Sequence, residues 1–230
     1  PKYLADDFKD VTLVGDKMKP NAEVILGLNP DVIIGSSKLS EEVMAQLNKI
    51  AVTLPYSHIS ANWKDNLLAL GEITDKKDEA NKLISDYEEK SLKAKEDIKN
   101  KYKDQNILVI RVRRGLMYVY PADVYLNPVL YTDLGLKIPD IVTQAKAQAQ
   151  LTIETLAEIN PDAIFLQFED SENADAPEAL NELLANPIFE SLEATKNNKV
   201  FVNTVEPLAQ GGTAWSKVKF LDAVVDNLLK

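Results

Sequence analysis

The chain has 230 residues, a formal net charge of −10 and a hydrophobic fraction of 45%. This composition supports one large or two small packed domains, while the acidic balance argues against a nucleic-acid partner. The absence of cysteine excludes disulfides and thiol chemistry, and a single histidine, His58, argues against a histidine-rich metal site or a serine–histidine–aspartate triad.

The first 73 residues predict short strands alternating with helices. Asn21 is a typical N-cap, Pro30 stops the helix that follows, and the apolar residues after Pro30 predict a buried strand. In chain order we predict a strand at 11–14, this capped helix, a strand at 32–34, a helix at 40–49, a strand at 52–54 and a helix at 62–71.

Residues 74–103 contain neither glycine nor proline and predict one long helix. Apolar side chains recur in steps of three, four or seven, at Leu83, Tyr87, Ala94, Ile98 and Tyr102. Such a helix would span roughly 45 Å, enough to connect two lobes. We therefore interpret it as a strut between lobes rather than as an ordinary surface helix.

The remaining residues predict a second alternating region. A strand at 106–112 is followed by 116–120, which could return as a hairpin around Gly115. Further on, Thr152 is a second N-cap, and Pro161 ends the helix that it begins. We also predict helices at 127–135, 179–184, 187–194 and 215–229, and strands at 163–168 and 200–202. Strands alternating with helices predict mostly parallel sheets, whose ligands bind beyond the carboxyl ends of the strands.

Two segments of the chain repeat one pattern. Residues 23–34 and 154–165 share glutamate, the Asn-Pro-Asp tripeptide and an isoleucine at matching positions. The same helix–turn–strand unit used twice predicts two similar α/β lobes with a ligand cleft between them. We expect an N-terminal lobe at 1–73, an inter-lobe helix at 74–104 and a C-terminal lobe at 105–230.

In this order of elements the chain resembles the class III substrate-binding proteins of ABC importers, which carry ferric siderophores, haem or cobalamin. The resemblance rests on the repeat before the long helix, on Asn186-Pro-Ile-Phe189 with the lysines that follow it, and on Gly211-Gly212-Thr-Ala-Trp215 before the last helix. It implies two Rossmann-like lobes joined by one long helix. Family members usually begin with a further strand and helix, so the first lobe is expected to lack both.

The arginines at the end of the first strand of the second lobe are the most informative site candidates. Arg111 and Arg113 share a face by two-residue alternation, whereas Arg114 points the other way unless a turn rotates it. Guanidinium groups bind carboxylates through two hydrogen bonds, so an anionic ligand is expected here. The alternative is ion pairing with the protein's own carboxylates; we favour the ligand for Arg111 and Arg113 and leave Arg114 open.

Other candidates follow strands that should end at the same cleft. From the first lobe these are Ser37, Lys38, Tyr56 and His58, although a lone histidine is more often structural. From the second lobe they are Gln167 and Phe168, which occupy the equivalent position, together with Tyr118 and Trp215. Tyr118 could line the cleft, although alternating aromatic residues in a hairpin more often serve packing, and Trp215 could equally anchor the last helix.

No enzyme motif is present: there is no phosphate-binding loop, and paired carboxylates fall on predicted helices. The resemblance implies a receptor that captures a ferric siderophore, with no intrinsic cofactor and no metal ligands of its own. The arginines favour an anionic, citrate-based hydroxamate or carboxylate siderophore. Alternatives are a catecholate siderophore, haem or cobalamin, and, in a different class, an enzyme or regulatory domain on paired Rossmann-like lobes.

The resemblance also implies a partner and a location. Glu23 and Glu154 match the family position at which each lobe docks on the permease dimer, although a carboxylate also stabilises a helix start. We expect a monomer outside the cytoplasm, as a surface lipoprotein of a Gram-positive cell or in a periplasm. Membrane association would come only through a lipid anchor or the permease, and the signal or anchor segment is absent from this chain.

Overall fold

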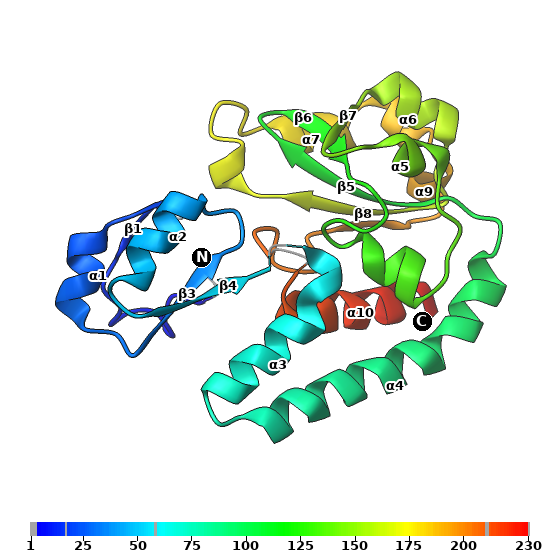
Figure 1. Cartoon of the computed structure of the whole chain (residues 1–230). Helices are drawn as coiled ribbons and strands as arrows, with labels where there is room; N and C mark the ends of the chain where they lie inside the picture. Colours follow the sequence, from blue (N-terminus) through cyan, green and yellow to red (C-terminus); the bar gives the residue numbers. More distant parts are fainter. Residues whose placement is uncertain (1–3, 17, 58, 210–211, 230) are drawn as a thin grey trace.

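The computed structural model describes residues 4–16, 18–57, 59–209 and 212–229. Within them the strands are β1 (Gly15–Asp16), β2 (Lys19–Pro20), β3 (Val32–Ser36), β4 (Val52–Tyr56), β5 (Ile107–Arg113), β6 (Leu116–Val119), β7 (Ala149–Leu151), β8 (Ala163–Phe168) and β9 (Val200–Val202). The α-helices are α1 (Ala22–Leu28), α2 (Glu41–Asn48), α3 (Trp63–Ile73), α4 (Lys77–Tyr102), α5 (Asp140–Gln144), α6 (Ile153–Ile159), α7 (Ala179–Leu184), α8 (Pro187–Glu190), α9 (Glu193–Lys196) and α10 (Ala214–Leu229). Figure 1 shows an α/β protein with one long helix, which confirms the predicted fold class.

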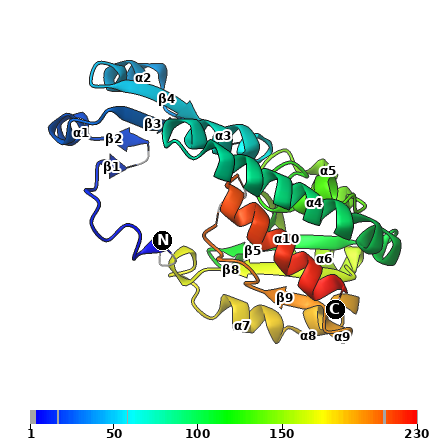
Figure 2. The ribbon, with the colours of Figure 1, turned by 90° about the horizontal axis from the view of Figure 1, so that it is seen from below.

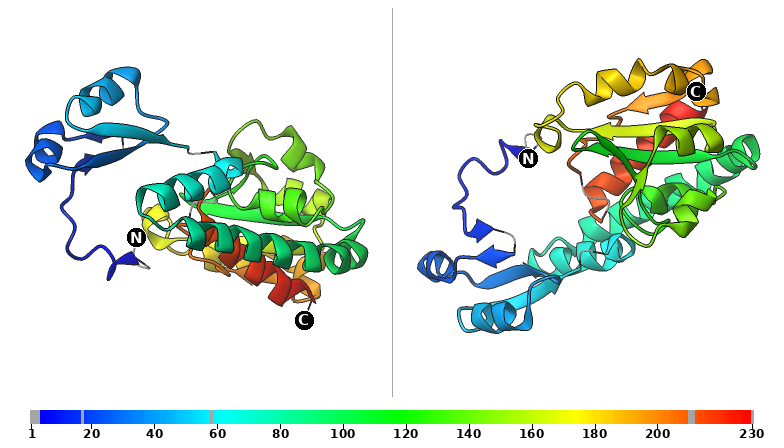
Figure 3. Two further views of the ribbon diagram at one scale, coloured as in Figure 1. Left: turned by 60° about the horizontal axis from the view of Figure 1, so that its bottom comes forward. Right: turned by 90° about the horizontal axis from the view of Figure 1, so that it is seen from above.

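The N-terminal region is thin. Strands β3 and β4 pair in parallel and form a sheet of two strands, with α1 and α2 beside it. Figure 3 shows this region apart from the larger body, to which the chain leads through α3. With so few strands the sheet cannot bury both of its faces, and Ile34 remains 45% exposed. The prediction of a buried strand after Pro30 is therefore wrong for this copy of the repeat.

The predicted strand at 11–14 is also wrong. These residues extend without a neighbouring strand in the described chain, and Leu13 is 85% exposed. Pairing occurs just afterwards, where β1 and β2 form a short antiparallel hairpin and Asn21 donates its amide N–H to the Val14 carbonyl (2.7 Å). An apolar run forms a strand only where a partner supplies the other half of the hydrogen-bond ladder.

The long helix is confirmed, with a later start than predicted. Asp75 adopts a left-handed conformation (φ 56°) between α3 and α4, so α4 begins at Lys77 rather than at residue 74. Its predicted apolar stripe is buried at Tyr87, Ala94, Ile98 and Tyr102, and the helix packs on α3 and α10. The long helix is thus packed on α3 and on α10 of the C-terminal body (Figure 2).

The C-terminal body has three layers around a sheet in the order β7-β6-β5-β8-β9. Pairing is parallel from β5 through β8 to β9 and antiparallel from β5 through β6 to β7, because β5 and β6 form the predicted hairpin. Figure 1 shows α4 and α10 below the sheet and α6, α7 and α9 above it. Two elements of this body, α5 and β7, have no counterpart in the prediction.

Two predicted helices differ from the observed ones. The segment at 127–135 forms a π-helix at Val129–Asp133. The single helix predicted at 187–194 is split into α8 and α9, because Leu192 takes an extended conformation (ψ 149°) and Ser191 donates its hydroxyl to the Ile188 carbonyl (2.7 Å). Leu192 is buried at this break, so packing outweighs helical continuity.

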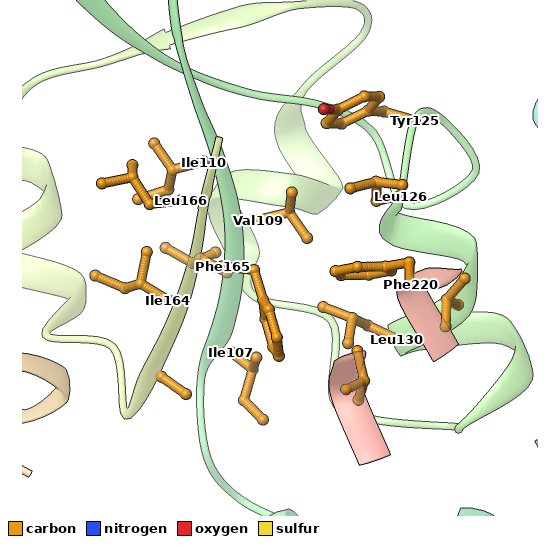
Figure 4. Packing of buried hydrophobic residues seen from close by; sticks show 14 of the residues in the cluster. Ile107, Val109, Ile110, Tyr125, Leu126, Leu130, Ile164, Phe165, Leu166 and Phe220 are labelled. Carbon is orange, nitrogen blue, oxygen red and sulfur yellow. The ribbon is translucent and has the colours of Figure 1, made fainter. Parts of the chain in front are cut away.

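The sheet side chains form the hydrophobic core on both faces. Figure 4 shows Val109 and Phe165 directed toward Leu130 and Phe220, while Ile110 and Leu166 point to the opposite side. The rings of Phe165 and Phe220 meet edge to face at 5.2 Å between centroids, and both residues are fully buried. Alternation along strands covered on both sides explains why β5 and β8 are apolar almost throughout.

The repeated segments share one local structure. The Asn21 side chain accepts hydrogen bonds from the first turn of α1, and Thr152 does the same for α6. Each helix ends at an asparagine with left-handed backbone, Asn29 (φ 47°) and Asn160 (φ 44°), one residue before the proline. The asparagines therefore terminate the helices, and the prolines prevent their continuation.

A buried ion pair joins the helices on the lower face of the sheet in Figure 1. Lys217 of α10 is 2% exposed, and its Nζ lies 3.4 Å from Oδ2 of Asp133. Tyr87 of α4 donates its hydroxyl to the same oxygen (2.6 Å), and Trp63 of α3 packs edge-on against the Tyr87 ring. Burial lowers the pKa of Lys217, and Asp133 opposes that shift. The charge on Lys217 thus depends on Asp133.

Replacing Asp133 by alanine should lower the free energy of unfolding by about 3 kcal/mol, because Lys217 would keep a buried charge without a partner. The loss of stability relative to the wild type should become smaller as the pH rises toward about 10. In the variant, Lys217 releases its proton at a lower pH when folded than when unfolded, so its buried charge disappears. Urea unfolding followed by circular dichroism measures both effects. Asp86→Ala, which removes the exposed pair between Lys82 and Asp86, is the control, and equal midpoints for the two variants would contradict the prediction.

Candidate functional site

The arginine-rich strand ends in a tight turn at the carboxyl edge of the sheet. Arg114 (φ 50°) and Gly115 (φ 73°) both have positive φ, as a two-residue hairpin turn of type I′ requires. The turn pairs Arg113 with Leu116 and Arg111 with Tyr118. Arg114 therefore occupies the turn itself and is exposed, whereas Arg111 and Arg113 share one face of the sheet as predicted.

Arg111 is engaged within the protein. Its Nε and Nη2 donate to Oε2 and Oε1 of Glu172 at 3.0 and 2.8 Å, and its side chain is only 7% exposed. The guanidinium also lies over the Tyr125 ring, 5.1 Å from the centroid. Burial acts to lower the pKa of Arg111, but Tyr125, Glu172 and Tyr120 outweigh it, so the pKa is raised and the group remains charged. Arg111 therefore forms an ion pair with one of the protein's own carboxylates, which was the alternative to direct ligand binding.

Arg113 is held more loosely and faces solvent. Its side chain is 38% exposed, its Nε lies 3.2 Å from Oε1 of Glu172, and its Nη1 donates to Oε1 of Gln148 (2.8 Å). Tyr120 donates its hydroxyl to the same Gln148 oxygen (3.1 Å). Within the described residues no hydrogen bond comes from Nη2 of Arg113. Arg113 can therefore bind an anion with the outer end of its guanidinium.

The 3₁₀ turn Asp170–Glu172, which follows β8, is fastened to the hairpin. Asn173 is fully buried, accepts a hydrogen bond from the Gly115 amide (3.1 Å) and donates to the Val112 carbonyl (3.0 Å). The Glu172 carbonyl accepts from the Arg114 amide (3.0 Å). The carboxylate of Glu172 is thereby placed between the two arginines.

Three predicted site residues form one row across the sheet. Tyr118 of β6, Arg111 of β5 and Gln167 of β8 are direct neighbours in register. Gln167 is fully buried, and its amide has no hydrogen-bond partner in the described chain. Tyr118 is half-buried. Phe168 belongs to the opposite face of the sheet, where it is buried in the core, so it is a packing residue and not part of this row.

The candidates from the first lobe gather at the carboxyl ends of β3 and β4. Ser37 donates its amide N–H to the Tyr56 carbonyl (2.9 Å), and the Lys38 amide donates to Oγ of Ser36 (3.2 Å). Ser37 and Lys38 are exposed, and burial raises the pKa of Tyr56. Figure 1 shows β4 and β8 with their carboxyl ends directed toward the middle of the molecule. His58 lies outside the described residues.

Trp215 is the second residue of α10 and is 39% exposed. Together with Thr204 and Asp226 it lines a cavity of about 460 Å³ beside α10. A second cavity, of about 340 Å³, adjoins the β5–β6 hairpin, and no arginine lines it. The arginine cluster is therefore an open surface in this conformation rather than part of either cavity.

Sequence reasoning missed the partners of the arginines. Glu172 carried a signal, because an acidic run follows β8 and the carboxyl ends of adjacent parallel strands meet at one edge. Gln148 and Tyr125 carried none, since each reaches the cluster from a loop distant in sequence. Among the described residues, no group of acidic or histidine side chains is arranged to hold a metal ion.

Glu23 and Glu154 lie in the first turns of α1 and α6. Both side chains are exposed, and neither forms an ion pair within the described residues. Both are thus available to a partner, as well as placed to stabilise their helix starts.

None of the helices in the described part of the chain has the length and apolarity of a membrane span.

Replacing Arg111 by methionine should lower the free energy of unfolding by about 2 kcal/mol or more, because Glu172 would lose its two-point partner in a largely buried setting. Arg114→Met removes a neighbouring exposed guanidinium and should leave stability nearly unchanged. Urea unfolding of both variants measures the difference. Equal midpoints would show that the Arg111–Glu172 pair contributes no net stability.

Comparison with known proteins gives consistent matches over most of the chain. The family model for periplasmic binding proteins matches residues 1–205. The iron-uptake system-binding protein of Bacillus subtilis is 51% identical over 227 residues, which are 97% of this chain and 72% of that protein. The probable siderophore-binding lipoprotein YfiY of the same organism is 32% identical, over 85% of this chain and 62% of its own length.

Solved structures agree with these matches. The iron-uptake system-binding protein FeuA of Bacillus subtilis superposes with a TM-score of 0.96, covering 99% of this chain and 82% of that one. A second structure shows FeuA, described as a triscatecholate siderophore binding protein, in complex with ferri-bacillibactin. Its TM-score is 0.87 at 49% identity, and the match covers 100% of this chain and 81% of that one. Staphylococcus aureus SirA complexed with staphyloferrin B gives 0.77 at 30% identity, over 99% and 81%. The chain therefore belongs to the periplasmic binding protein family, a family of binding proteins and not of enzymes.

Proposed function

We propose that this protein is the extracytoplasmic receptor of an iron-uptake system, which binds a ferric siderophore and delivers it to an ABC permease. The observation that carries the proposal is Arg113, a guanidinium held by Glu172 and Gln148 with its outer end open at the carboxyl edge of the sheet. The names of the related proteins, which describe iron uptake and siderophore binding, support it.

The ligand class that we now favour differs from the one predicted from the sequence. A citrate-based siderophore was expected, but the structure at 49% identity carries ferri-bacillibactin and is described as a triscatecholate-binding protein. A ferric tris-catecholate is trianionic, which suits a site built around fixed cations. Staphyloferrin B, which is bound in the SirA complex at 30% identity, is the second candidate ligand.

The proposed site combines side chains from both sheets. Arg113 and Tyr118 would contact the ligand from the large sheet, and Lys38 would supply a second positive charge from the end of β3. Ser37, Tyr56 and Trp215 would contribute polar or aromatic contacts. We propose that Arg111 and Gln167 support this surface from beneath, since both are buried. A ferric chelate supplies its own oxygen ligands, so the protein needs to recognise only its charge and shape.

Arg113→Met and Lys38→Met should each weaken binding of ferri-bacillibactin by roughly tenfold to a hundredfold, since each removes a charge-assisted contact of about 1.5–3 kcal/mol. Quenching of tryptophan fluorescence during titration measures the affinity. Lys49→Met, which removes an exposed charge at the end of α2, is the matched control. Affinities equal to that control in both variants would exclude these two residues from the site.

The repeat suggests how the receptor meets its permease. We propose that Glu23 and Glu154 form two matched contacts with basic residues of the permease, one from each lobe, with lobes at 1–73 and 105–230 and a monomeric receptor. The proposed location is outside the cytoplasm, with a lipid anchor favoured because the 32% identical relative is named a lipoprotein.

The double variant Glu23→Ala/Glu154→Ala should keep its affinity for the ferric siderophore and lose stimulation of ATP hydrolysis by the permease, because it removes the docking charges alone. The control is Glu41→Ala/Glu158→Ala, which removes one exposed acid from α2 and one from α6. If stimulation of ATP hydrolysis falls only as far as folding or ligand binding falls, the two glutamates act only as helix-start residues.

A further inference from the structure

We propose that Glu172 is a positioning residue for ligand binding: it orients Arg113 toward the ligand and cancels the charge of Arg111. This inference rests on the proposed function, in which Arg113 contacts an anionic chelate. It assigns a favourable role to a carboxylate that lies beside the binding surface for an anion.

The geometry shows a division of labour between two arginines that share one carboxylate. Glu172 makes two short hydrogen bonds to Arg111, and its Oε1 is also 3.2 Å from Nε of Arg113. Gln148 accepts from Nη1 of Arg113 on the other side. A guanidinium has five N–H donors in one plane, so fixing Nε and one Nη fixes the direction of the rest. What remains to face solvent is the outer end with Nη2.

The charges lead to the same assignment. Two guanidinium groups two residues apart on one face would repel each other, and Arg111 is almost completely buried. One carboxylate, 17% exposed, neutralises one of them and leaves a single net positive charge on the more exposed Arg113. A buried cation without a partner would be costly, so Arg111 and Glu172 must be kept together.

The backbone keeps this carboxylate in place. The Glu172 backbone carbonyl accepts a hydrogen bond from the Arg114 amide. The side chain of the next residue, Asn173, accepts a hydrogen bond from the Gly115 amide and donates one to the Val112 carbonyl. The hairpin that carries Arg113 and the turn that carries Glu172 therefore move as one unit. Positioning of this kind reduces the conformational entropy that the Arg113 side chain loses on binding.

Simple electrostatics predicts the opposite of our proposal, and this makes the proposal testable. Removing a negative charge next to an anionic ligand should strengthen binding if charge alone matters. If Glu172 acts by orienting Arg113, its removal should weaken binding. The exposed Asp170, two residues earlier in the same turn, has no ion pair within the described residues and provides a matched control for charge.

The test compares Glu172→Gln with Asp170→Asn in titrations with ferri-bacillibactin. Ferrioxamine B, whose ferric complex has no net negative charge, is the comparison ligand. We expect Glu172→Gln to weaken ferri-bacillibactin binding about tenfold and Asp170→Asn to leave it unchanged or slightly tighter. In an Arg113→Met background, Glu172→Gln should have less than a twofold effect, since the interaction acts through Arg113. Binding by Glu172→Gln as tight as by Asp170→Asn would overturn the proposal.

A second measurement needs no ligand. The Nε–H signal of Arg113 in a ¹⁵N NMR spectrum should be sharp and protected from exchange in the wild type, and broadened in Glu172→Gln. If the wild type bound no ferric chelate while this signal behaved as expected, the proposed function would fail, whereas the orientation of Arg113 by Glu172 would hold. An unchanged signal in Glu172→Gln would refute the positioning role. Arg111→Met/Glu172→Gln, which removes the buried cation together with its counter-charge, serves if Glu172→Gln is too unstable to study.

Discussion

The parallel ladder between β5 and β8 determines where the other parts of the C-terminal body lie. Six residue pairs are in register from Ile107 and Ala163 to Val112 and Phe168, and the strands are covered by helices on both faces. The same ladder places Arg111 beside Gln167 and brings the turn that follows β8 against the β5–β6 hairpin. A shift of one residue would turn Arg111 into the opposite face, away from Glu172. The site thus depends on the register of the core.

Two carboxylates in this protein, Asp133 and Glu172, each interact with two side chains. Asp133 pairs with the Lys217 ammonium and accepts a hydrogen bond from the Tyr87 hydroxyl. Glu172 forms ion pairs with both Arg111 and Arg113. In each case one carboxylate neutralises a buried cation, Lys217 in the first cluster and Arg111 in the second, because an isolated charge in a low-dielectric interior is unfavourable. The two clusters differ in what remains: the first is closed around helices, while the second leaves a guanidinium facing solvent.

The N-terminal region has a much smaller sheet than the C-terminal body. Its two-stranded parallel sheet leaves apolar side chains such as Ile34 and Val52 exposed, whereas the corresponding strand β8 in the C-terminal body is buried throughout. Equal local sequence patterns therefore led to unequal packing. The helix caps are nevertheless alike in the two copies, since a cap needs only its own neighbouring residues.

The amino-acid sequence by itself determined the features that depend on near neighbours: the caps at Asn21 and Thr152, the apolar stripe of the long helix, the hairpin at Gly115 and the alternation that puts Arg111 and Arg113 on one face. The family resemblance could be recognised from the same patterns. Only the tertiary structure decided that Arg111 is buried against Glu172, that Phe168 packs in the core, and that residues 11–14 pair with no strand of the described chain. Those outcomes depend on which distant segments meet, and local propensity does not specify a partner that another part of the chain has to supply.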